Sequence, residues 1–316
     1  MSLLKYIVRK FIICLTTLFF VVTLTFVLMK SIPGNPFLQE QAIPEEIMKG
    51  LKAHYGLDKP IYEQYAKYLK GIITCNLGPS FKYEGRTIND IIRNGFPISF
   101  SLGILTLLIA IGWGVFWGSL AAVYKGSFID RFATVIAVLG MSLPSFIMAT
   151  FLQYFFALKL GWLPIARWGS FNHMILPAIA MSSFPSAFIA RLTKSSMIEV
   201  LEKDYILTAK SKGLSTFEIW KNHVFKNSLL PVVSYLGALT ANILTGSFVV
   251  EKIFGIPGLG AFFVNSIINR DYTIIMGLTI FYSSLLMITI FLSDLFFLIL
   301  DPRIKTGLSD YEKKLA

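Results

Sequence analysis

PISFSLGILTLLIAIGWGVFWGSLAAV, residues 97–123, contains no charged side chain. A helix of about 20 apolar residues is long enough to cross the hydrocarbon core of a bilayer. Five further runs of this kind occupy 11–29, 132–158, 174–190, 229–250 and 274–300. We therefore predict an all-α integral membrane protein with six transmembrane helices.

The positions of the charged residues support this interpretation. All 29 Lys and Arg residues lie outside the six runs, and Asp294 is the only one of 18 acidic residues inside them. A charge in the bilayer core is costly, so such a partition is expected of membrane spans. The net charge of +11 is also typical of nucleic-acid-binding proteins. However, the basic residues here lie between long apolar runs, and the mean hydropathy is +0.66. We expect a membrane and no nucleic acid as the partner.

The distribution of Lys and Arg also predicts the orientation. With the N-terminus inside, the cytoplasmic segments hold sixteen of these residues and the two short external loops hold four. Positive residues favour the cytoplasmic side, so both termini are predicted to be cytoplasmic. The first run is too long for the core of a signal peptide and is predicted to remain as an anchor. The predicted parts are a tail with the first helix (1–30), an external cap (31–96), a transmembrane domain (97–303) containing a cytoplasmic loop (191–228), and a cytoplasmic tail (304–316).

Several local patterns predict structural features. Helical periodicity at 44–54 and 61–73 indicates a small folded cap, for which docking, gating and structural cover all remain open. Small residues at every fourth position of the second run predict a helix-packing face; they are Ala110, Gly114, Gly118 and Ala122. Prolines are expected to bend the third and fourth helices; they are Pro144, Pro177 and Pro185. Asp294 lies near the cytoplasmic edge, where we favour a structural partner over a proton relay.

Residues with catalytic or ligand-binding chemistry are sparse. Two cysteines and three histidines lie far apart, without metal-ligand spacing. The glycine-rich stretch 255–260 lacks the Lys-Ser/Thr pair of a phosphate-binding loop and is predicted to be external. We expect no metal, no cofactor and no enzymatic activity in this chain. Polar residues within the spans could line a path or form hydrogen bonds between helices; they are Ser183, Thr240, Asn242 and Thr245.

The loop 191–228 is the most informative segment. A single helix is predicted over 195–212, since apolar residues recur there at helical spacing: Met197, Ile198, Leu201 and Tyr205. Gly213 would end this helix in a left-handed conformation. Ser215 and Glu218 form a capping-box pattern that opens a second helix.

The second helix is predicted to carry an apolar stripe of Phe217, Trp220 and Val224. Two interpretations follow from these residues alone. The segment could lie on anionic lipid as an interfacial helix, or it could dock onto a partner protein. The composition favours neither interpretation.

A resemblance to a known family distinguishes the two. Residues 205–214, YILTAKSKGL, and 223–231, HVFKNSLLP, resemble the coupling-loop signature of ABC-importer permeases of the dipeptide, oligopeptide and nickel group. Ala209 and Gly213 match the fixed alanine and glycine of that signature. Leu207 and Thr208 stand where many family members have Glu and Ala, and the interval from Gly213 to Pro231 is longer. The peptide and nickel branch shares these departures.

The resemblance extends along nearly the whole chain. Residues 246–260 (GSFVVEKIFGIPGLG), 269–272 (NRDY) and 300–303 (LDPR) resemble segments of the same group. Residues 33–37 (PGNPF) and 78–83 (GPSFKY) are most similar to the B-type permease subunit of its oligopeptide branch.

The resemblance implies a type I ABC-importer permease fold and transport of peptides across a bacterial inner membrane. It also implies the partners: a second permease, two cytoplasmic ATPases that bind Mg-ATP, and an external solute-binding protein. The residues implied to couple to the ATPases are Tyr205, Thr208, Ala209, Gly213, Leu214, Phe217 and Trp220. The alternatives are a nickel or other small-solute permease of the same group, and a secondary transporter driven by an ion gradient.

Overall fold

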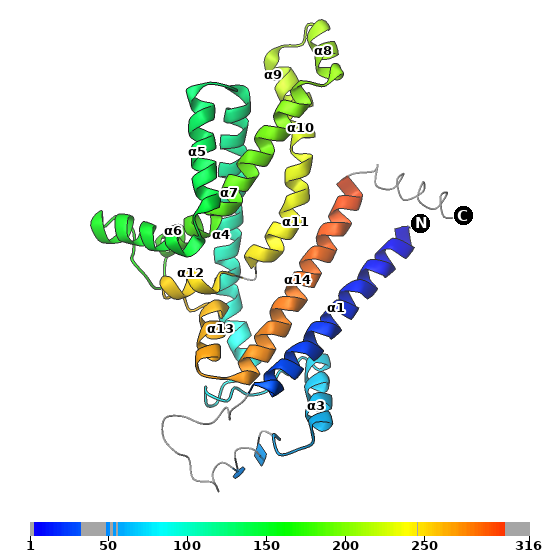
Figure 1. Ribbon diagram of the computed structural model, residues 1–316, viewed down its shortest axis with the longest axis vertical. Coiled ribbons are helices and arrows are strands. Elements are labelled where there is room, and N and C mark those ends of the chain that lie inside the picture. The colour runs from blue at the N-terminus through cyan, green and yellow to red at the C-terminus, as the bar shows by residue number, and fades with distance from the viewer. Residues whose placement is uncertain (1–2, 33–48, 51–52, 55, 245, 301–316) are drawn as a thin grey trace.

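The computed structural model describes residues 3–32, 49–50, 53–54, 56–244 and 246–300. These residues are helical and contain no extended strand, only an isolated bridge between Pro79 and Thr87. Figure 1 shows the long helices α1, α4, α7, α11 and α14 in one elongated bundle. Their bounds are Leu3–Ser31, Ile88–Val123, Asn172–Leu201, Leu230–Leu244 and Tyr272–Leu300.

Five helical segments of the described chain are long and apolar enough to cross a membrane, and a sixth is obtained if one bent pair counts as a span. That pair is α5 (Phe128–Ser142) followed by α6 (Ser145–Leu152) and the π-helical η1 (Gln153–Lys159). Its two parts differ in direction by 108°. The predicted bend of the third helix at Pro144 is therefore confirmed, and the span over 132–158 is broken there into two helices.

Pro144 accounts for the break. The residue before a proline is driven out of the helical region by a clash with the proline ring. Leu143 accordingly has extended backbone angles (φ −89°, ψ 123°). Pro177 and Pro185, by contrast, both lie inside the continuous helix α7.

Three other helix ends differ from the prediction. Helix α4 begins at Ile88 rather than 97, because Thr87 and Asp90 form a capping box. Helix α7 continues past 190 to Leu201. The span predicted over 229–250 is interrupted after Leu244, and α12 (Phe248–Ile253) starts anew after Gly246, whose φ is +80°.

Helices α4 and α7 form the tightest pair of the bundle. A Cβ atom built on Gly118 would lie 2.4 Å from the carbonyl oxygen of Ala190. One built on Gly114 would lie 2.6 Å from the side chain of Ile189. These glycines, with the buried Ala110 and Ala122, allow the two backbones to approach closely. The predicted packing face is thus confirmed.

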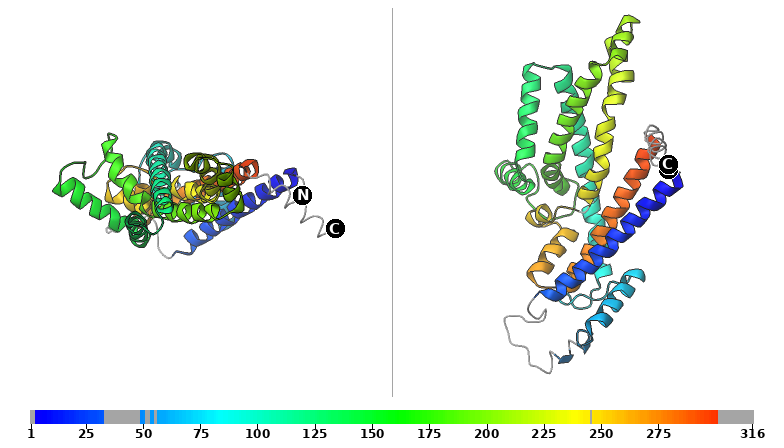
Figure 2. Two further views of the ribbon diagram at one scale, coloured as in Figure 1. Left: turned by 90° about the horizontal axis from the view of Figure 1, so that it is seen from above. Right: turned by 45° about the vertical axis from the view of Figure 1, so that its right-hand side comes forward.

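Helix α1 packs along α14 at the edge of the bundle (Figures 1 and 2). The ammonium group of Lys10 lies 2.7 Å from the carboxylate of Asp294 and joins the two helices. The expectation of a structural partner for Asp294 is confirmed. The N-terminal end of α1 and the C-terminal end of α14 lie beside each other and point toward the end of the molecule that carries α8 and α9.

The opposite end holds α3 (Ile61–Ile73) and α13 (Leu259–Ile268). The helix predicted over 61–73 is confirmed by α3. Most of the helix predicted over 44–54 lies outside the described residues. So do the motif 33–37 and the predicted tail 304–316.

Candidate functional site: a helical turn and a central cavity

A helix–turn–helix unit stands at one tip of the molecule (Figure 1). It consists of α8 (Asp204–Ser211), a turn at Gly213, and α9 (Thr216–Ile219), which continues into η2 (Trp220–Val224) and α10 (Phe225–Ser228). Gly213 has a φ of +79°. Its N–H donates to the Lys210 carbonyl at 3.0 Å, and the Leu214 N–H donates to the Ala209 carbonyl at 3.3 Å. These are the two hydrogen bonds of a Schellman motif, so the predicted glycine cap is confirmed.

The predicted capping box is also present. The Ser215 hydroxyl donates to Glu218 at 2.7 Å and accepts the Glu218 N–H at 3.3 Å, while the Ser215 N–H donates to the Glu218 carboxylate at 2.9 Å. These bonds favour the ionised carboxylate and lower the pKa of Glu218 below its ordinary value. Two successive local motifs therefore fix the geometry of the turn.

The structure corrects the helix predicted over 195–212. Helix α7 ends at Leu201, Lys203 is extended, and α8 begins at Asp204. The break turns α8 back so that Ile206 and Ala209 become buried against Met197. Burial of this apolar surface is the physical reason for two helices in place of one.

The predicted apolar stripe is wrong at Phe217. Ile219 and Val224 are buried, and Trp220 packs against the same cluster, but Phe217 is 73% exposed. Ile219 follows Phe217 by two residues, which is about 200° around a helix, so the two side chains point in nearly opposite directions. The unit therefore has a buried inner face and an exposed outer face.

The inner face attaches the unit firmly to the bundle. Ile206, Ala209, Ile219 and Val224 form one cluster with Met197 of α7, and the cluster also includes Val200 and Ala122. The outer face carries four exposed apolar side chains among its charged and polar residues, and they are Tyr205 (42%), Leu207 (59%), Leu214 (37%) and Phe217 (73%). An exposed apolar group on a well-packed support is typical of a docking surface.

The other predicted coupling residues take different places. Ala209 is 5% exposed and lies in the buried cluster. The Thr208 hydroxyl donates to the Asp204 carbonyl within α8. The ring of Tyr205 is outside, where its hydroxyl accepts a hydrogen bond from the Asn227 amide at 3.3 Å. Ala209 and Trp220 thus belong to the buried side of the unit, whereas Tyr205, Leu214 and Phe217 belong to its exposed outer face.

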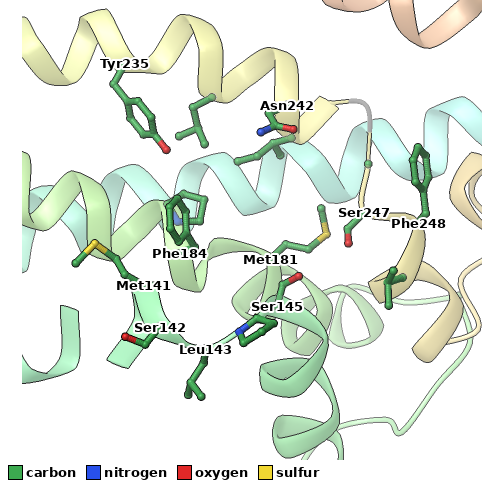
Figure 3. Close-up of a pocket in the computed structure, with 16 residues that line it drawn as sticks. Met141, Ser142, Leu143, Ser145, Met181, Phe184, Tyr235, Asn242, Ser247 and Phe248 are labelled. Atoms are coloured by element: carbon green, nitrogen blue, oxygen red, sulfur yellow. The ribbon is translucent and has the colours of Figure 1, made fainter. Parts of the chain in front are cut away.

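A second feature is a cavity of about 570 Å³ between α5, α7 and α11. It lies where two helices are interrupted, at Pro144 and at Gly246 (Figure 3). Irregular backbone at membrane depth is tolerated where it lines a cavity. The lining residues are Met141, Ser142, Leu143, Pro144, Ser145, Met181, Phe184, Pro185, Tyr235, Leu239, Asn242, Ile243, Gly246, Ser247, Phe248 and Val249.

The chemistry of this lining is neutral. None of the lining residues is Lys, Arg, Asp or Glu, and the polar groups come from Tyr235, Asn242 and serines. Figure 3 shows Asn242 and Tyr235 on α11 across from Phe184 and Met181 on α7. A wall of this kind combines flexible thioethers and aromatic rings with groups that both donate and accept hydrogen bonds.

Of the four predicted path residues, Asn242 lines the cavity. The Ser183 hydroxyl instead donates to the Ala180 carbonyl of its own helix at 2.8 Å. Thr240 is not part of this wall, and Thr245 lies outside the described residues. The sequence did not reveal the cavity because its location depends on where two helices break.

Two carboxylates that sequence reasoning gave no role organise the end of the bundle that holds α3 and α13. Glu251 is fully buried and accepts the Gly260 N–H at 2.9 Å. A Cβ atom on Gly258 would lie 2.3 Å from its Oε2, so glycine is required for this close approach. The motif 246–260 therefore folds around its own glutamate.

Asp271, also fully buried, joins two segments that are far apart in the sequence. Its carboxylate accepts the Ser80 hydroxyl at 2.5 Å and the Lys82 N–H at 3.2 Å. It also accepts the Ile274 N–H at 3.2 Å in the first turn of α14. Motifs 78–83 and 269–272 thus form one clasp between the cap and α14.

The described residues contain no group of three His, Cys, Asp or Glu side chains that could hold a metal ion. The candidate site consists instead of the exposed outer face of the α8–α9 unit at one end, the neutral cavity in the middle and the clasped cap at the other end.

Comparison with known proteins agrees with this architecture. The dipeptide transport system permease protein DppB of Bacillus subtilis is 51% identical over 301 residues, which cover 95% of this chain and 98% of that protein. The oligopeptide transport system permease protein OppB of Haemophilus influenzae is 41% identical over 96% of this chain and 100% of that protein.

Solved structures show the same fold at low sequence identity. A chain of the MetNI methionine ABC transporter in an inward-facing conformation matches with a TM-score of 0.56 and 15% identity, covering 67% of this chain and 96% of that one. An amino acid ABC transporter crystallised with histidines matches with a TM-score of 0.52, covering 66% and 92%.

Two family profiles match consecutive parts of the chain. Residues 3–103 match the N-terminal part of the binding-protein-dependent transport system membrane component, and residues 114–306 match its inner membrane component. The chain is a multi-pass membrane protein that belongs to the family of binding-protein-dependent transport system inner membrane components, the ABC-importer permeases.

Proposed function

We propose that this permease moves peptides through the neutral cavity, driven by ATPase subunits that dock on the outer face of the α8–α9 unit. The observation that carries this proposal is the exposed apolar group on a unit that is packed rigidly onto α7 and α4. Related permeases named for dipeptides and oligopeptides support the substrate class. The complete transporter would contain a second permease, two ATPases binding Mg-ATP and an external solute-binding protein.

The structure supports a mechanical path between the two sites. A displacement of the α8–α9 unit acts on Met197 and Val200, which belong to the same helix as the cavity residues Met181 and Phe184. Because α7 packs so closely on α4, the two helices would move together. Transport then requires two discrete arrangements of the bundle, whose populations depend on the state of the ATPases.

The neutral cavity suits a peptide substrate. Peptides share a backbone with donors and acceptors but differ in side-chain charge. Asn242 and Tyr235 offer both donors and acceptors, and the lining adds no fixed charge that would favour one substrate charge. Nickel or another small solute is the second candidate from the sequence, and the described residues offer that ion no cluster of ligands.

The orientation is part of the proposal. The α8–α9 unit, the N-terminal end of α1 and the C-terminal end of α14 would face the cytoplasm, with the cap of α3 and α13 outside. The excess of Lys and Arg in the predicted cytoplasmic segments supports this assignment.

Uptake by the reconstituted transporter tests the proposal. Phe217→Ser removes an exposed docking side chain, and Phe128→Ser on α5 is the matched control, since Phe128 is 79% exposed. We expect Phe217→Ser to lose ATP-driven peptide uptake and Phe128→Ser to retain it. Normal uptake by Phe217→Ser, or uptake driven by an ion gradient without ATP, would refute the proposed coupling. Uptake of Ni²⁺ but not of peptides would refute the substrate class alone.

A further inference from the structure

A second large cavity, of about 560 Å³, lies at the external end of the bundle. Its walls come from the end of α1, from the cap with α3, and from the start of α14. Lys30, the first charged residue after the apolar run of α1, lines this cavity, so the cavity lies where α1 is expected to leave the membrane. We call it the interfacial cavity. It is separate from the neutral cavity and is not required by the proposed transport mechanism.

The charged residues that line the interfacial cavity are all basic. Lys30, Lys67 and Lys70 line it, and no acidic side chain does so in the described part of the chain. Lys30 contacts the Gln64 amide oxygen and lies over the ring of Phe26. Lys67 and Lys70 are exposed and take part in no ion pair with a described residue.

The two lysines of α3 are three residues apart, so they are neighbours on one helix face. Like charges at this spacing repel each other, and an anion bound between them would offset that repulsion. The acidic residue nearest in α3, Glu63, pairs instead with Lys59 at 3.8 Å. The cavity therefore offers a site for a negatively charged ligand.

Two phenol rings also belong to the cavity wall. Tyr68 and Tyr272 both line the cavity, and their hydroxyls are buried without a partner among the described residues. Burial raises the pKa of Tyr68. Because both hydroxyl oxygens are closed off by their neighbours, a ligand in the cavity contacts the lysines rather than these phenols.

Part of the remaining wall is apolar. Phe26 and Met29 of α1 and Met276 of α14 line the cavity together with the lysines. The adjoining surface of α1 is open, with Val27 51% and Leu28 52% exposed. A ligand that fits must therefore have an anionic head and an apolar tail.

We propose that the interfacial cavity binds an anionic phospholipid of the outer leaflet, with its phosphate at Lys67 and Lys70 and an acyl chain along α1. Lysines next to an anionic membrane surface each contribute about 1 kcal/mol of attraction, and the choice of the outer leaflet rests on the proposed orientation. The lipid would bind between α1, α3 and α14 and hold the cap against the membrane edge of the bundle.

The test measures lipid retained by the purified transporter in mixed micelles, by native mass spectrometry. Phosphatidylglycerol is the anionic probe and phosphatidylcholine the zwitterionic one. Lys67→Gln/Lys70→Gln should weaken phosphatidylglycerol retention about fivefold for each lysine removed. Lys59→Gln, on the same cap but outside the cavity, should not change it. Lys67→Arg/Lys70→Arg keeps the charge and should restore retention, which separates loss of charge from misfolding.

Four results would overturn the proposal. The first is equal retention of the two lipids by the unmodified protein, and the second is unchanged retention in the glutamine variant. The third is complete displacement of phosphatidylglycerol by inorganic phosphate, which would indicate a site for free anions. The fourth is loss of solute-binding-protein-dependent uptake in the glutamine variant with unchanged lipid retention, which would assign the lysines to protein docking.

Discussion

Replacing Gly118 by alanine should separate helices α4 and α7. The new Cβ atom would lie 2.4 Å from the Ala190 carbonyl oxygen and 2.7 Å from the Thr193 Cβ atom. The first contact is with backbone, which cannot rotate away as a side-chain tip can. Since Cβ atoms are essentially never found closer than 3.0 Å to such atoms, the helices must separate by at least the difference, 0.6 Å, at this level.

The energetic cost follows from that separation. A gap of about 0.5–1 Å already forfeits a quarter to a half of the dispersion energy of the contacts involved. Overpacking of this kind typically costs about 1–3 kcal/mol. Gly112 provides the control on the same helix, because a Cβ atom there meets nothing within 4 Å. Gly112→Ala should be neutral or stabilising, since alanine is the better helix former.

Thermal unfolding of the two purified variants, in the same detergent and with their partner subunits, measures this difference. Gly118→Ala should have the lower Tm. A loss of about 1–2 kcal/mol of stability corresponds to a fall of about 5- to 30-fold in the folded-to-unfolded ratio. Equal Tm values for Gly118→Ala and Gly112→Ala would show that α4 and α7 do not pack as closely as described.

Three further predictions concern the polar contacts. Asp294→Leu alone should lower the Tm of the transporter by leaving Lys10 unpaired, and the double change Lys10→Leu/Asp294→Leu should restore part of it; no recovery in the double variant would argue against the ion pair. Asp271→Asn should lower the free energy of unfolding by about 1–3 kcal/mol, because an amide cannot accept all the hydrogen bonds that the carboxylate accepts. It should also speed proteolysis of the cap next to Ser80, and unchanged cleavage would refute the clasp. Because the pKa of folded Glu218 is lowered, its capping contribution is complete at neutral pH and is lost as pH falls through that pKa. The Ser215 backbone amide donates to this carboxylate, so its protection from exchange, relative to the intrinsic rate at each pH, should fall over this acidic range in the native protein and stay constant in Glu218→Gln; a constant protection in the native protein would refute the capping role.

The sequence alone predicted features that arise from local interactions. The cap at Gly213 and the capping box at Ser215 follow from residues within five positions of each other, so neighbouring residue types suffice to specify them. The spans follow equally directly from the cost of charge in lipid. A structural partner rather than a proton relay was also expected for Asp294, and the ion pair with Lys10 agrees with that expectation.

The errors arose where tertiary packing decides between alternatives. Proline was expected to bend the third span, but the size of the bend, 108°, depends on what the following segment packs against. Phe217 was predicted on the wrong side of its helix, because Ile219 rather than Phe217 packs in the buried cluster with Met197. The clasp at Asp271 joins residues about 190 positions apart, and no local pattern predicts such a contact.

Site-directed cross-linking tests the central claim, docking of the ATPase on the α8–α9 unit, most directly. Cys14 and Cys75, the two native cysteines, are first replaced by serine. Phe217→Cys and the control Phe128→Cys are then introduced separately, each opposite cysteines placed on the ATPase surface. Our account predicts a disulfide to the ATPase from position 217, with a yield that changes when ATP is bound, and none from position 128. A cross-link from position 128 together with none from position 217 would contradict it.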